Sequence, residues 1–371
     1  MGGSFRIFRA YGVEVKIHWT FFLLFVFFGG YGYLLGGTVL GAVFMMALIS
    51  VLFVFVLLHE FRHAVVAIRQ GIEVPDITLL PIGGLARLKT MPEKPWDEVK
   101  IAIAGPLVNV ALAAVLYGVS VLVFGVSPLT LPSPEVLASG TSSVGLIFSY
   151  LAFMNIILGV FNMIPAFPMD GGRILRGILA SRFGPVRATD ISSTVGQIFA
   201  FGFFIFGLLS GLFLLALIAV FIFFGAGGEA QMVRQREMMR GLTVADVMGN
   251  KRRTETLSPY NNFGQVLDAV RHGYQEDFPI VDDDTGRLVG MITRDEIMKA
   301  AHSSDKFLSV RDLMKTDYPT VPPEADLFKE GYQILQENRV RAAPVMKDGE
   351  LVGMITVDDV RQASLLQQLP K

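Results

Sequence analysis

The chain has 371 residues, a formal net charge of −1 and no cysteine. This length allows two or more domains, while the nearly neutral charge argues against a nucleic-acid-binding protein that works through a basic surface. The lack of cysteine excludes disulfides and thiolate ligands, so any metal must be held by histidine and carboxylate side chains.

Apolar residues make up 52% of the chain, and the mean hydropathy is +0.52. They concentrate in residues 17–225, whereas residues 229–371 have the composition of an ordinary soluble protein. A helix of about 20 apolar residues spans a bilayer. On this criterion we expect six transmembrane helices, at residues 19–40, 39–68, 101–124, 144–168, 191–209 and 212–224.

Lysine and arginine occur in every second loop of this arrangement. They precede the first helix, lie between the second and third and between the fourth and fifth, and follow the sixth, while the other loops contain none. Positive charge is enriched in cytoplasmic loops. The pattern predicts a multi-pass protein of the cell membrane with both termini in the cytoplasm.

Charged side chains are rare in these apolar runs, which makes the sequence His59-Glu60-x-x-His63 conspicuous. Residues four apart share a helix face, so both imidazoles can bind one zinc ion and Glu60 can reach a metal-bound water. The alternative is a histidine pair buried by hydrogen bonds or paired with Glu60. Unpaired polar groups are costly inside a membrane, and this cost favours zinc.

The expected chemistry follows from the ligand types. Zinc lowers the pKa of a bound water toward neutrality, and Glu60 would accept its proton and pass it to the leaving amine. His59 lies about nine residues from the cytoplasmic end of its helix, or roughly 13 Å at 1.5 Å per residue. The metal would therefore lie within the hydrocarbon region, on the cytosolic side.

A catalytic zinc normally has three protein ligands and one open position. No third histidine follows at the spacing of the extended soluble motif, where this chain has Arg69. The candidate is Asp170, which ends a segment with two prolines and two glycines, residues 162–172. Such a broken helix is tolerated at membrane depth where it lines a cavity. Alternatively, Asp170 caps a helix over residues 171–181.

Four motifs resemble those of the site-2 proteases, which are intramembrane zinc metalloproteases: HEFRH at 59–63, LLPIGGLARL at 79–88, AGPLVN at 104–109 and FNMIPAFPMDGGRILR at 161–176. The similarity is greatest to archaeal and bacterial members with appended CBS domains. It implies zinc ligands at His59, His63 and Asp170 and a general base at Glu60. It also implies that Asn162 stabilises the oxyanion or holds substrate, although a helix–helix hydrogen bond explains Asn162 equally well.

One residue departs from the family pattern. The fourth position of the HExxH motif is usually small, and here it is Arg62. A cation beside the metal site could disfavour the metal or pair with a carboxylate. Alternatively, its side chain could face the lipid boundary and extend toward water.

Residues 71–89 alternate apolar and polar side chains around Pro81-Ile82-Gly83-Gly84. We expect a membrane-associated strand that pairs with an unwound substrate. The alternative is a hairpin on the bilayer surface.

The C-terminal part contains an internal repeat after a linker at residues 229–242. VADVM at 244–248 returns as VRDLM at 310–314, and GMITRDE at 290–296 returns as GMITVDD at 353–359. Each copy, 243–302 and 309–366, predicts the order strand, helix, strand, strand, helix. The repeat resembles a CBS domain pair, a module that commonly binds adenine nucleotides between its halves.

That resemblance implies nucleotide contacts, with ATP or AMP as the ligand, at Thr356 and Asp359 in the second copy. A carboxylate can accept two hydrogen bonds from a ribose diol, and a threonine hydroxyl can donate to phosphate. The first copy has Thr293 and, in place of the aspartate, the longer Glu296, so the resemblance implies a degenerate site there. The alternative is a structural or dimerising element without a ligand.

Together these patterns predict a polytopic α-helical membrane protein with a small membrane-associated β element at residues 1–228, joined to a cytoplasmic α/β CBS pair. The expected function is intramembrane proteolysis of transmembrane helices in membrane-tethered substrates. The expected partners are that substrate, the lipid bilayer, an adenine nucleotide and a second copy bound through the CBS domains, but no nucleic acid. The alternatives are a CBS-gated transporter and a catalytically silent scaffold, which Arg62 leaves open.

Overall fold

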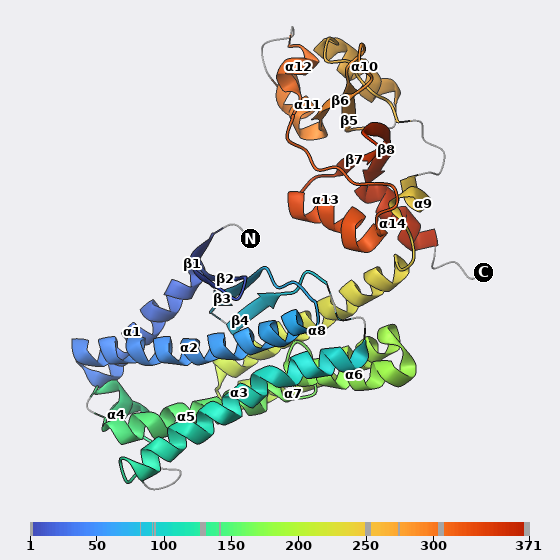
Figure 1. Ribbon diagram of the computed structural model, residues 1–371. Helices are drawn as coiled ribbons and strands as arrows, with labels where there is room; N and C mark the ends of the chain where they lie inside the picture. The colour runs from blue at the N-terminus through green and yellow to red at the C-terminus, as the bar shows by residue number, and fades with distance from the viewer. Residues whose placement is uncertain are drawn as a thin grey trace. The chain divides into compact units, whose positions relative to one another are not determined.

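The computed structural model describes residues 3–81, 83–90, 92, 94–126, 131–140, 142–248, 254–273, 275–302 and 308–366 (Figure 1). The chain divides into two compact units, Met1–Val233 and Arg234–Lys371. The first is largely helical and carries one small sheet, and the second holds two short sheets covered by helices.

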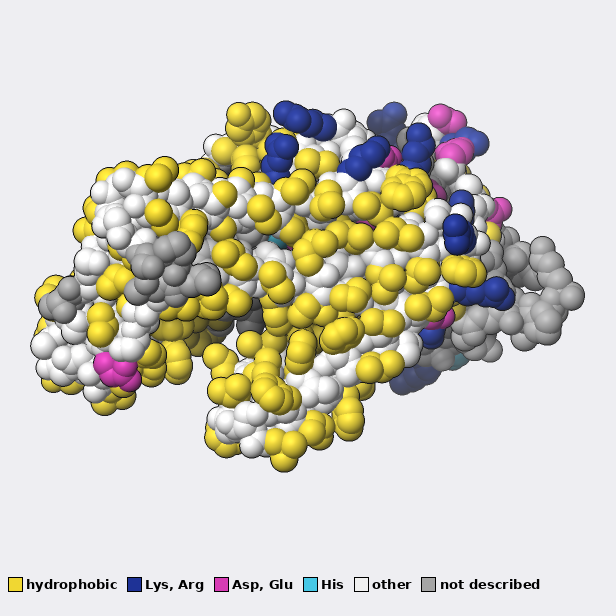
Figure 2. All heavy atoms as spheres, turned by 90° about the horizontal axis from the view of Figure 1, so that it is seen from below, with side chains coloured by type: hydrophobic (Ala, Val, Ile, Leu, Met, Phe, Trp, Pro, Cys, Tyr) yellow, Lys and Arg dark blue, Asp and Glu magenta, His cyan; other side chains and the backbone are white. Residues whose placement is uncertain are grey.

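Among the described residues, six helices are long and apolar enough to cross a membrane, which confirms the predicted number. Figure 2 shows hydrophobic side chains over a broad area of one face of these helices, with lysine and arginine gathered toward one end. The helices are α1 (Phe22–Gly36) together with the 3₁₀ turn that precedes it (Trp19–Phe21), α2 (Val39–Arg69), α3 (Pro95–Leu122), α5 (Val144–Asn162), α7 (Pro185–Leu209) and α8 (Phe213–Met238).

Several helix ends differ from the hydropathy-based bounds. Helix α3 begins at Pro95, because a proline in the first turn needs no N–H partner and acidic residues there complement the helix dipole. Helix α5 ends at Asn162, ahead of Pro165 and Pro168, which cannot continue a regular helix. Helix α8 continues to Met238, so most of the predicted linker at 229–242 is helical.

Two shorter helices, α4 (Pro134–Ala138) and α6 (Asp170–Phe183), complete the described helices of this unit. Its sheet has the order β1 (Ser4–Ala10), β2 (Val13–His18), β3 (Asp76–Leu80) and β4 (Gly83–Arg87). Strands β2 and β3 are parallel, and the other neighbours are antiparallel. Strand β4 is therefore an edge strand.

The hairpin of β1 and β2 was not predicted from the sequence. Tyr11 and Gly12 form its turn, and both have a positive φ, as a two-residue hairpin with the strand twist requires. Val13 and Val15 are fully buried while the intervening Glu14 is not. The predicted strand region at 71–89 is a hairpin of β3 and β4, built onto β2.

The second unit contains two copies of one arrangement. The first has α9 (Val244–Met248), α10 (Phe263–His272), β5 (Phe278–Val281), β6 (Leu288–Ile292) and α11 (Arg294–Ala301). The second has α12 (Val310–Leu313), a π-helical turn (Leu327–Tyr332), α13 (Gln333–Asn338), β7 (Ala342–Lys347), β8 (Glu350–Thr356) and α14 (Val357–Leu366). The predicted leading strand of each copy is only a single bridge, at Leu257 and at Val321.

The two copies exchange their first helices. Val244 of α9 is buried in the core of the second copy, and its N–H donates to the Ala325 carbonyl at 2.9 Å. Val310 of α12 is buried in the core of the first copy and donates to the Asn261 carbonyl at 2.9 Å. Each core is thus completed by a segment that precedes the other copy in the sequence.

Candidate metal centre

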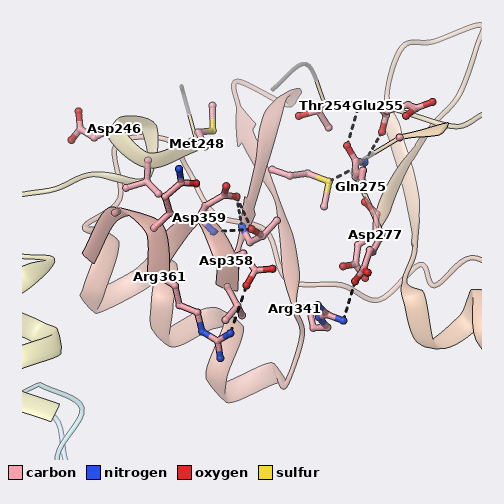
Figure 3. Close-up of a pocket in the computed structure, with 18 residues that line it drawn as sticks. Asp246, Met248, Thr254, Glu255, Gln275, Asp277, Arg341, Asp358, Asp359 and Arg361 are labelled. Atoms are coloured by element: carbon pink, nitrogen blue, oxygen red, sulfur yellow. Dashed lines mark hydrogen bonds and ion pairs between the residues drawn. The ribbon is translucent and has the colours of Figure 1, made fainter. Parts of the chain in front are cut away.

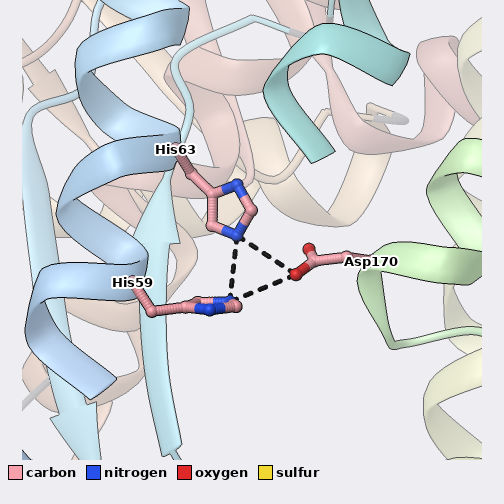
Figure 4. Close-up of side chains that lie close together, drawn as sticks. All are labelled: His59, His63 and Asp170. Carbon is pink, nitrogen blue, oxygen red and sulfur yellow. Dashed lines mark hydrogen bonds and ion pairs between the residues drawn. The ribbon is translucent and has the colours of Figure 1, made fainter. Parts of the chain in front are cut away.

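Helix α2 presents His59 and His63 on one face, as the i, i+4 spacing predicts. Both side chains are buried, and their Nε2 atoms lie 3.1 Å apart. Figure 4 shows both rings directed at one carboxylate, that of Asp170. Its Oδ2 lies 3.1 Å from Nε2 of His59 and 3.2 Å from Nε2 of His63.

These distances fit a tetrahedral metal. Donors bound at about 2.0–2.1 Å to a tetrahedral zinc are separated from one another by about 3.3 Å. The three donor atoms of His59, His63 and Asp170 form such a triangle. Two imidazoles and one carboxylate are also a common donor set of catalytic zinc. The residues present therefore fit the ion that the sequence predicts.

The start of α6 places Asp170. Met169 occupies the N-cap position and Asp170 is the first helical residue, so the alternative in which Asp170 caps this helix is wrong. The next two residues must be glycine. A β-carbon on Gly171 would lie 2.3 Å from the Ile164 carbonyl oxygen, and one on Gly172 would lie 2.5 Å from the carbonyl carbon of Ala166 and the nitrogen of Phe167. The two glycines let the helix begin tightly against the preceding loop.

An ion-pair cluster holds α6 against two other helices. The buried Arg176 guanidinium donates to Glu98 of α3 (Nε to Oε1, 2.8 Å) and to Glu229 of α8 (Nη1 to Oε1, 3.0 Å). Its guanidinium carbon also lies 5.2 Å from the centroid of the Phe167 ring. Sequence patterns did not indicate this cluster, because Glu229 lies in the predicted linker and Glu98 precedes the predicted membrane helix.

The other nitrogen of each imidazole also has a partner. Nδ1 of His63 lies 2.6 Å from the Ile101 carbonyl oxygen, and Nδ1 of His59 contacts Oδ1 of Asn109. A carbonyl oxygen can only accept, so Nδ1 of His63 donates and its Nε2 lone pair is directed at Asp170. Asn109 ends the AGPLVN motif but was not predicted as a site residue. Its signal was an amide in an apolar helix.

Gly105 of the same motif provides the space for both rings. A β-carbon at this position would lie 2.3 Å from Nε2 of His63 and 2.7 Å from Cε1 of His59. Only glycine therefore leaves room for the metal-facing edges of the imidazoles. This steric role of Gly105 was not predicted from the motif.

Glu60 is half-buried beneath the edge strand. A β-carbon on Gly84 of β4 would lie 2.4 Å from its Cγ and 3.4 Å from its Oε1. Arg62 is exposed. Asn162 is the last residue of α5, and its Nδ2 donates to the Leu158 carbonyl of the same helix at 3.0 Å.

The second unit contains a cleft of about 940 Å³. Thr356 and Asp359 line it, and the threonine hydroxyl donates to the carboxylate at 2.7 Å. Figure 3 shows Asp359 on one wall and Gln275 and Asp277 on the facing wall. Several apolar side chains complete the lining, among them Met248.

The corresponding pair of the first copy has different surroundings. The Thr293 hydroxyl donates to Glu296, whose other oxygen lies 2.8 Å from Nζ of Lys315. Neither residue is among those that line the cleft. Burial opposes ionisation of Glu296, but the hydrogen bonds from Lys315 and Thr293 outweigh it and lower its pKa. Its carboxylate is thus held in an internal ion pair.

Comparisons with known proteins agree with these features. The family model "Peptidase family M50" matches residues 47–141 and 127–203, and the CBS domain model matches 244–303 and 310–366. A zinc metalloprotease of Methanocaldococcus jannaschii is 32% identical over all of this chain and 98% of that protein. Rip3 of Mycobacterium tuberculosis is 29% identical over 95% of this chain and 90% of that protein.

A solved structure, a site-2 protease from Methanocaldococcus jannaschii, is 36% identical and covers 61% of this chain and 95% of that chain, with a TM-score of 0.46. The full-length similarity to a zinc metalloprotease joins the helical unit and the CBS pair in one family pattern. The chain therefore belongs to Peptidase family M50, the site-2 protease family of membrane zinc metalloproteases, and carries a CBS domain pair.

Proposed function

We propose that this metalloprotease cleaves peptide bonds within transmembrane helices of membrane-tethered proteins, with His59, His63 and Asp170 as its zinc ligands. The observation that carries the proposal is the triangle of donor atoms, 3.1–3.2 Å apart, between α2, which is long enough to span a bilayer, and the start of α6. A metal site on a helix that spans the bilayer would act on chains that are themselves in the membrane.

Bound zinc would supply Lewis acidity, which activates water and polarises a carbonyl. Glu60 follows His59 directly in α2 and would take a proton from the attacking water and give it to the leaving amine. Asn162 ends α5 eight residues before Asp170. Its amide would bind the substrate carbonyl when it leaves the Leu158 carbonyl.

Strand β4 is the proposed docking edge for the unwound substrate. It ends the sheet order, and Gly84 lies against Glu60. An extended peptide added to an exposed strand edge satisfies its backbone hydrogen bonds, which lipid cannot do. A substrate with Gly-Pro near the cleaved bond should therefore be cut faster than one with Leu-Leu there. Equal rates would argue against a need for unwinding.

The positive charges support a topology with both termini in the cytoplasm. Because the chain has no cysteine, single cysteines can report it without background. Tyr11 and Glu135 are both exposed. Tyr11 precedes the first membrane helix, on the proposed cytoplasmic side, and Glu135 lies between α3 and α5, on the proposed outer side. A membrane-impermeant thiol reagent added outside cells should label Glu135→Cys and spare Tyr11→Cys. Labelling of Tyr11→Cys but not of Glu135→Cys would contradict the proposed topology and indicate the opposite orientation.

We further propose that an adenine nucleotide binds the CBS cleft and modulates cleavage. Thr356 and Asp359 line a cleft that also offers apolar side chains for a base. Thr293 and Glu296, engaged with Lys315, would contribute less. ATP and AMP are the ligands to test first. A homodimer formed through the CBS domains stays a prediction.

The test is cleavage of a single-span substrate by the full chain in proteoliposomes. Removal of zinc with a chelator should abolish cleavage, and added zinc should restore it. A CBS-gated transporter would instead show solute flux that survives zinc removal. A silent scaffold would show neither activity. Arg62 left that alternative open, but its side chain is exposed, whereas His59 and His63 are buried. Cleavage that persists in a zinc-free preparation would contradict the proposal.

A further inference from the structure

Behind His59 lies a chain of two buried asparagines. Asn109 of α3 and Asn155 of α5 are 0% and 1% exposed. Oδ1 of Asn109 contacts Nδ1 of His59, and Nδ2 of Asn109 donates to Oδ1 of Asn155 at 3.0 Å. Nδ2 of Asn155 in turn donates to the Leu151 carbonyl at 2.9 Å. Three helices, α2, α3 and α5, are thus linked through side-chain amides.

The backbone end of this chain fixes its direction. The Leu151 carbonyl can only accept, so the NH₂ group of Asn155 faces it and the oxygen of Asn155 faces Asn109. The NH₂ group of Asn109 must then face Asn155, which leaves its oxygen toward His59. Because that oxygen can only accept, Nδ1 of His59 carries the proton. Its Nε2 keeps a lone pair directed at Asp170.

We propose that Asn109 and Asn155 are positioning residues that hold the His59 ring in the metal-binding tautomer and orientation. This inference rests on the proposed zinc site. His63 needs no such pair, because its Nδ1 donates directly to the Ile101 carbonyl. Asn109 has no exposed surface to offer a substrate, and its one contact with the proposed zinc ligands is with His59.

The side chain of Asn109 is fully buried, and a β-carbon on Gly159 of α5 would lie 3.4 Å from Cβ of Asn109, at ordinary van der Waals distance. An apolar side chain would leave Nδ1 of His59 without its acceptor, and a buried unpaired donor is costly. The chain offers two informative replacements, leucine without an acceptor and aspartate with one.

The experiment measures zinc affinity by chelator competition, and the visible spectrum after cobalt substitution, in the detergent-solubilised full chain. Asn109→Leu should weaken zinc binding by about 10- to 100-fold, the usual effect of losing such a partner, and change the cobalt spectrum. Asn109→Asp keeps the acceptor and should restore affinity to within a few-fold of wild type. Asn155→Leu, which releases the Asn109 amide, should give a smaller loss.

Ser120→Ala is the matched control. Ser120 is a buried residue of α3 whose hydroxyl donates to the Gly145 carbonyl of α5 at 2.8 Å, so its loss breaks a hydrogen bond between the same helices away from His59. It should leave zinc affinity and the cobalt spectrum unchanged. A loss in Ser120→Ala equal to that in Asn109→Leu would reduce the asparagines to a packing role and overturn the inference.

Wild-type zinc affinity and an unchanged cobalt spectrum in Asn109→Leu would also overturn it. If Asn109→Leu does not fold, Asn155→Leu decides, since its side chain does not contact His59, and wild-type affinity there would count against the inference. Failure of the zinc site itself is recognisable. The wild-type chain would then bind no stoichiometric zinc, and all variants would match it.

Discussion

Gly105 and His63 lie so close that a β-carbon on Gly105 would be 2.3 Å from the metal-facing nitrogen of His63. The contact joins α3 to α2 beside the donor triangle. It gives the AGP sequence a physical meaning, since the backbone of α3 forms one wall of the site. Any side chain at position 105 would occupy the volume of the imidazoles.

Gly105→Ala should therefore lose zinc, although alanine is the better helix former. The expected loss is at least about 10-fold in zinc affinity, the lower end of what the loss of an outer hydrogen-bond partner of a ligand costs. Gly118→Ala is the matched control on the same helix, because a β-carbon there meets no atom of the described residues within 4 Å. It should bind zinc normally and be slightly more stable. Chelator competition on both variants checks this, and equal zinc affinity in the two would contradict it.

Asp170→Ala should lower zinc content more than removal of any outer hydrogen-bond partner does. Its Oδ2 is the one carboxylate oxygen of the donor triangle. Asp170→Asn keeps an oxygen but loses the negative charge, so its zinc affinity should lie between those of wild type and Asp170→Ala. Elemental analysis after dialysis against a weak chelator measures this. Full zinc occupancy in Asp170→Ala would remove Asp170 from the ligand set.

The CBS cleft makes a separate prediction. Asp359→Asn keeps an acceptor for the Thr356 hydroxyl but removes the negative charge. The hydrogen bond from the ribose of the nucleotide would then lose its charge assistance, and a hydrogen bond to a charged group contributes about 1.5–3 kcal/mol. AMP or ATP should therefore bind the variant roughly 10- to 100-fold more weakly. Glu296→Gln is the control from the other copy and should change affinity little, because Glu296 is engaged with Lys315. Calorimetry on the full chain decides, and equal losses would assign the nucleotide elsewhere.

Asp277 should make the second unit sensitive to pH. Burial raises the pKa of its carboxyl above the ordinary 3.8, despite the Arg294 N–H donated to it at 3.1 Å. A raised folded-state pKa gives stability that is complete below the unfolded pKa and is lost as the pH rises through the folded one. Asp277→Asn should thus gain thermal stability over wild type as the pH increases from 4 to 7.

Asp282 is the opposite case within the same unit. Hydrogen bonds from Thr285 lower the pKa of Asp282, so its charged form supports the fold above pH 3.8. Because this stability is lost as the pH falls through the lowered folded pKa, Asp282→Asn should lose stability relative to wild type as the pH rises from about 2 to about 5. Thermal melts of both variants at several pH values check the signs. If the stability of both variants relative to wild type changed in the same direction as the pH rises, the opposite pKa shifts of Asp277 and Asp282 would be contradicted.

The sequence predicted the elements whose signal is local and strong. Six apolar runs gave the membrane helices, and the spacing of His59 and His63 gave a shared helix face. The broken segment with its two prolines identified Asp170, which the structure brings beside them. In each case one stretch of sequence, together with the cost of a polar group in lipid, carried the information.

Features that depend on contact between distant segments were missed. Nothing in the sequence near Asn109 or Asn155 states that the two amides meet, because 46 residues separate them. Gly105 looked like one more small residue in an apolar helix. Glu229 lay outside the predicted span, although it pairs with Arg176. Such partners are defined by packing, and a hydropathy pattern does not encode which faces meet.

Glu60→Gln tests most directly whether Glu60 takes the proton from a water activated by a zinc ion that α2 and α6 hold. Glutamine keeps the shape of the side chain but cannot accept the proton, and loss of a general base lowers rates by about 10²–10⁴-fold. Zinc content and cleavage of a transmembrane substrate are measured on the same preparation in proteoliposomes. We expect wild-type zinc content in Glu60→Gln, with the cleavage rate reduced by that factor. Cleavage at the wild-type rate in a fully zinc-loaded Glu60→Gln protein would contradict it.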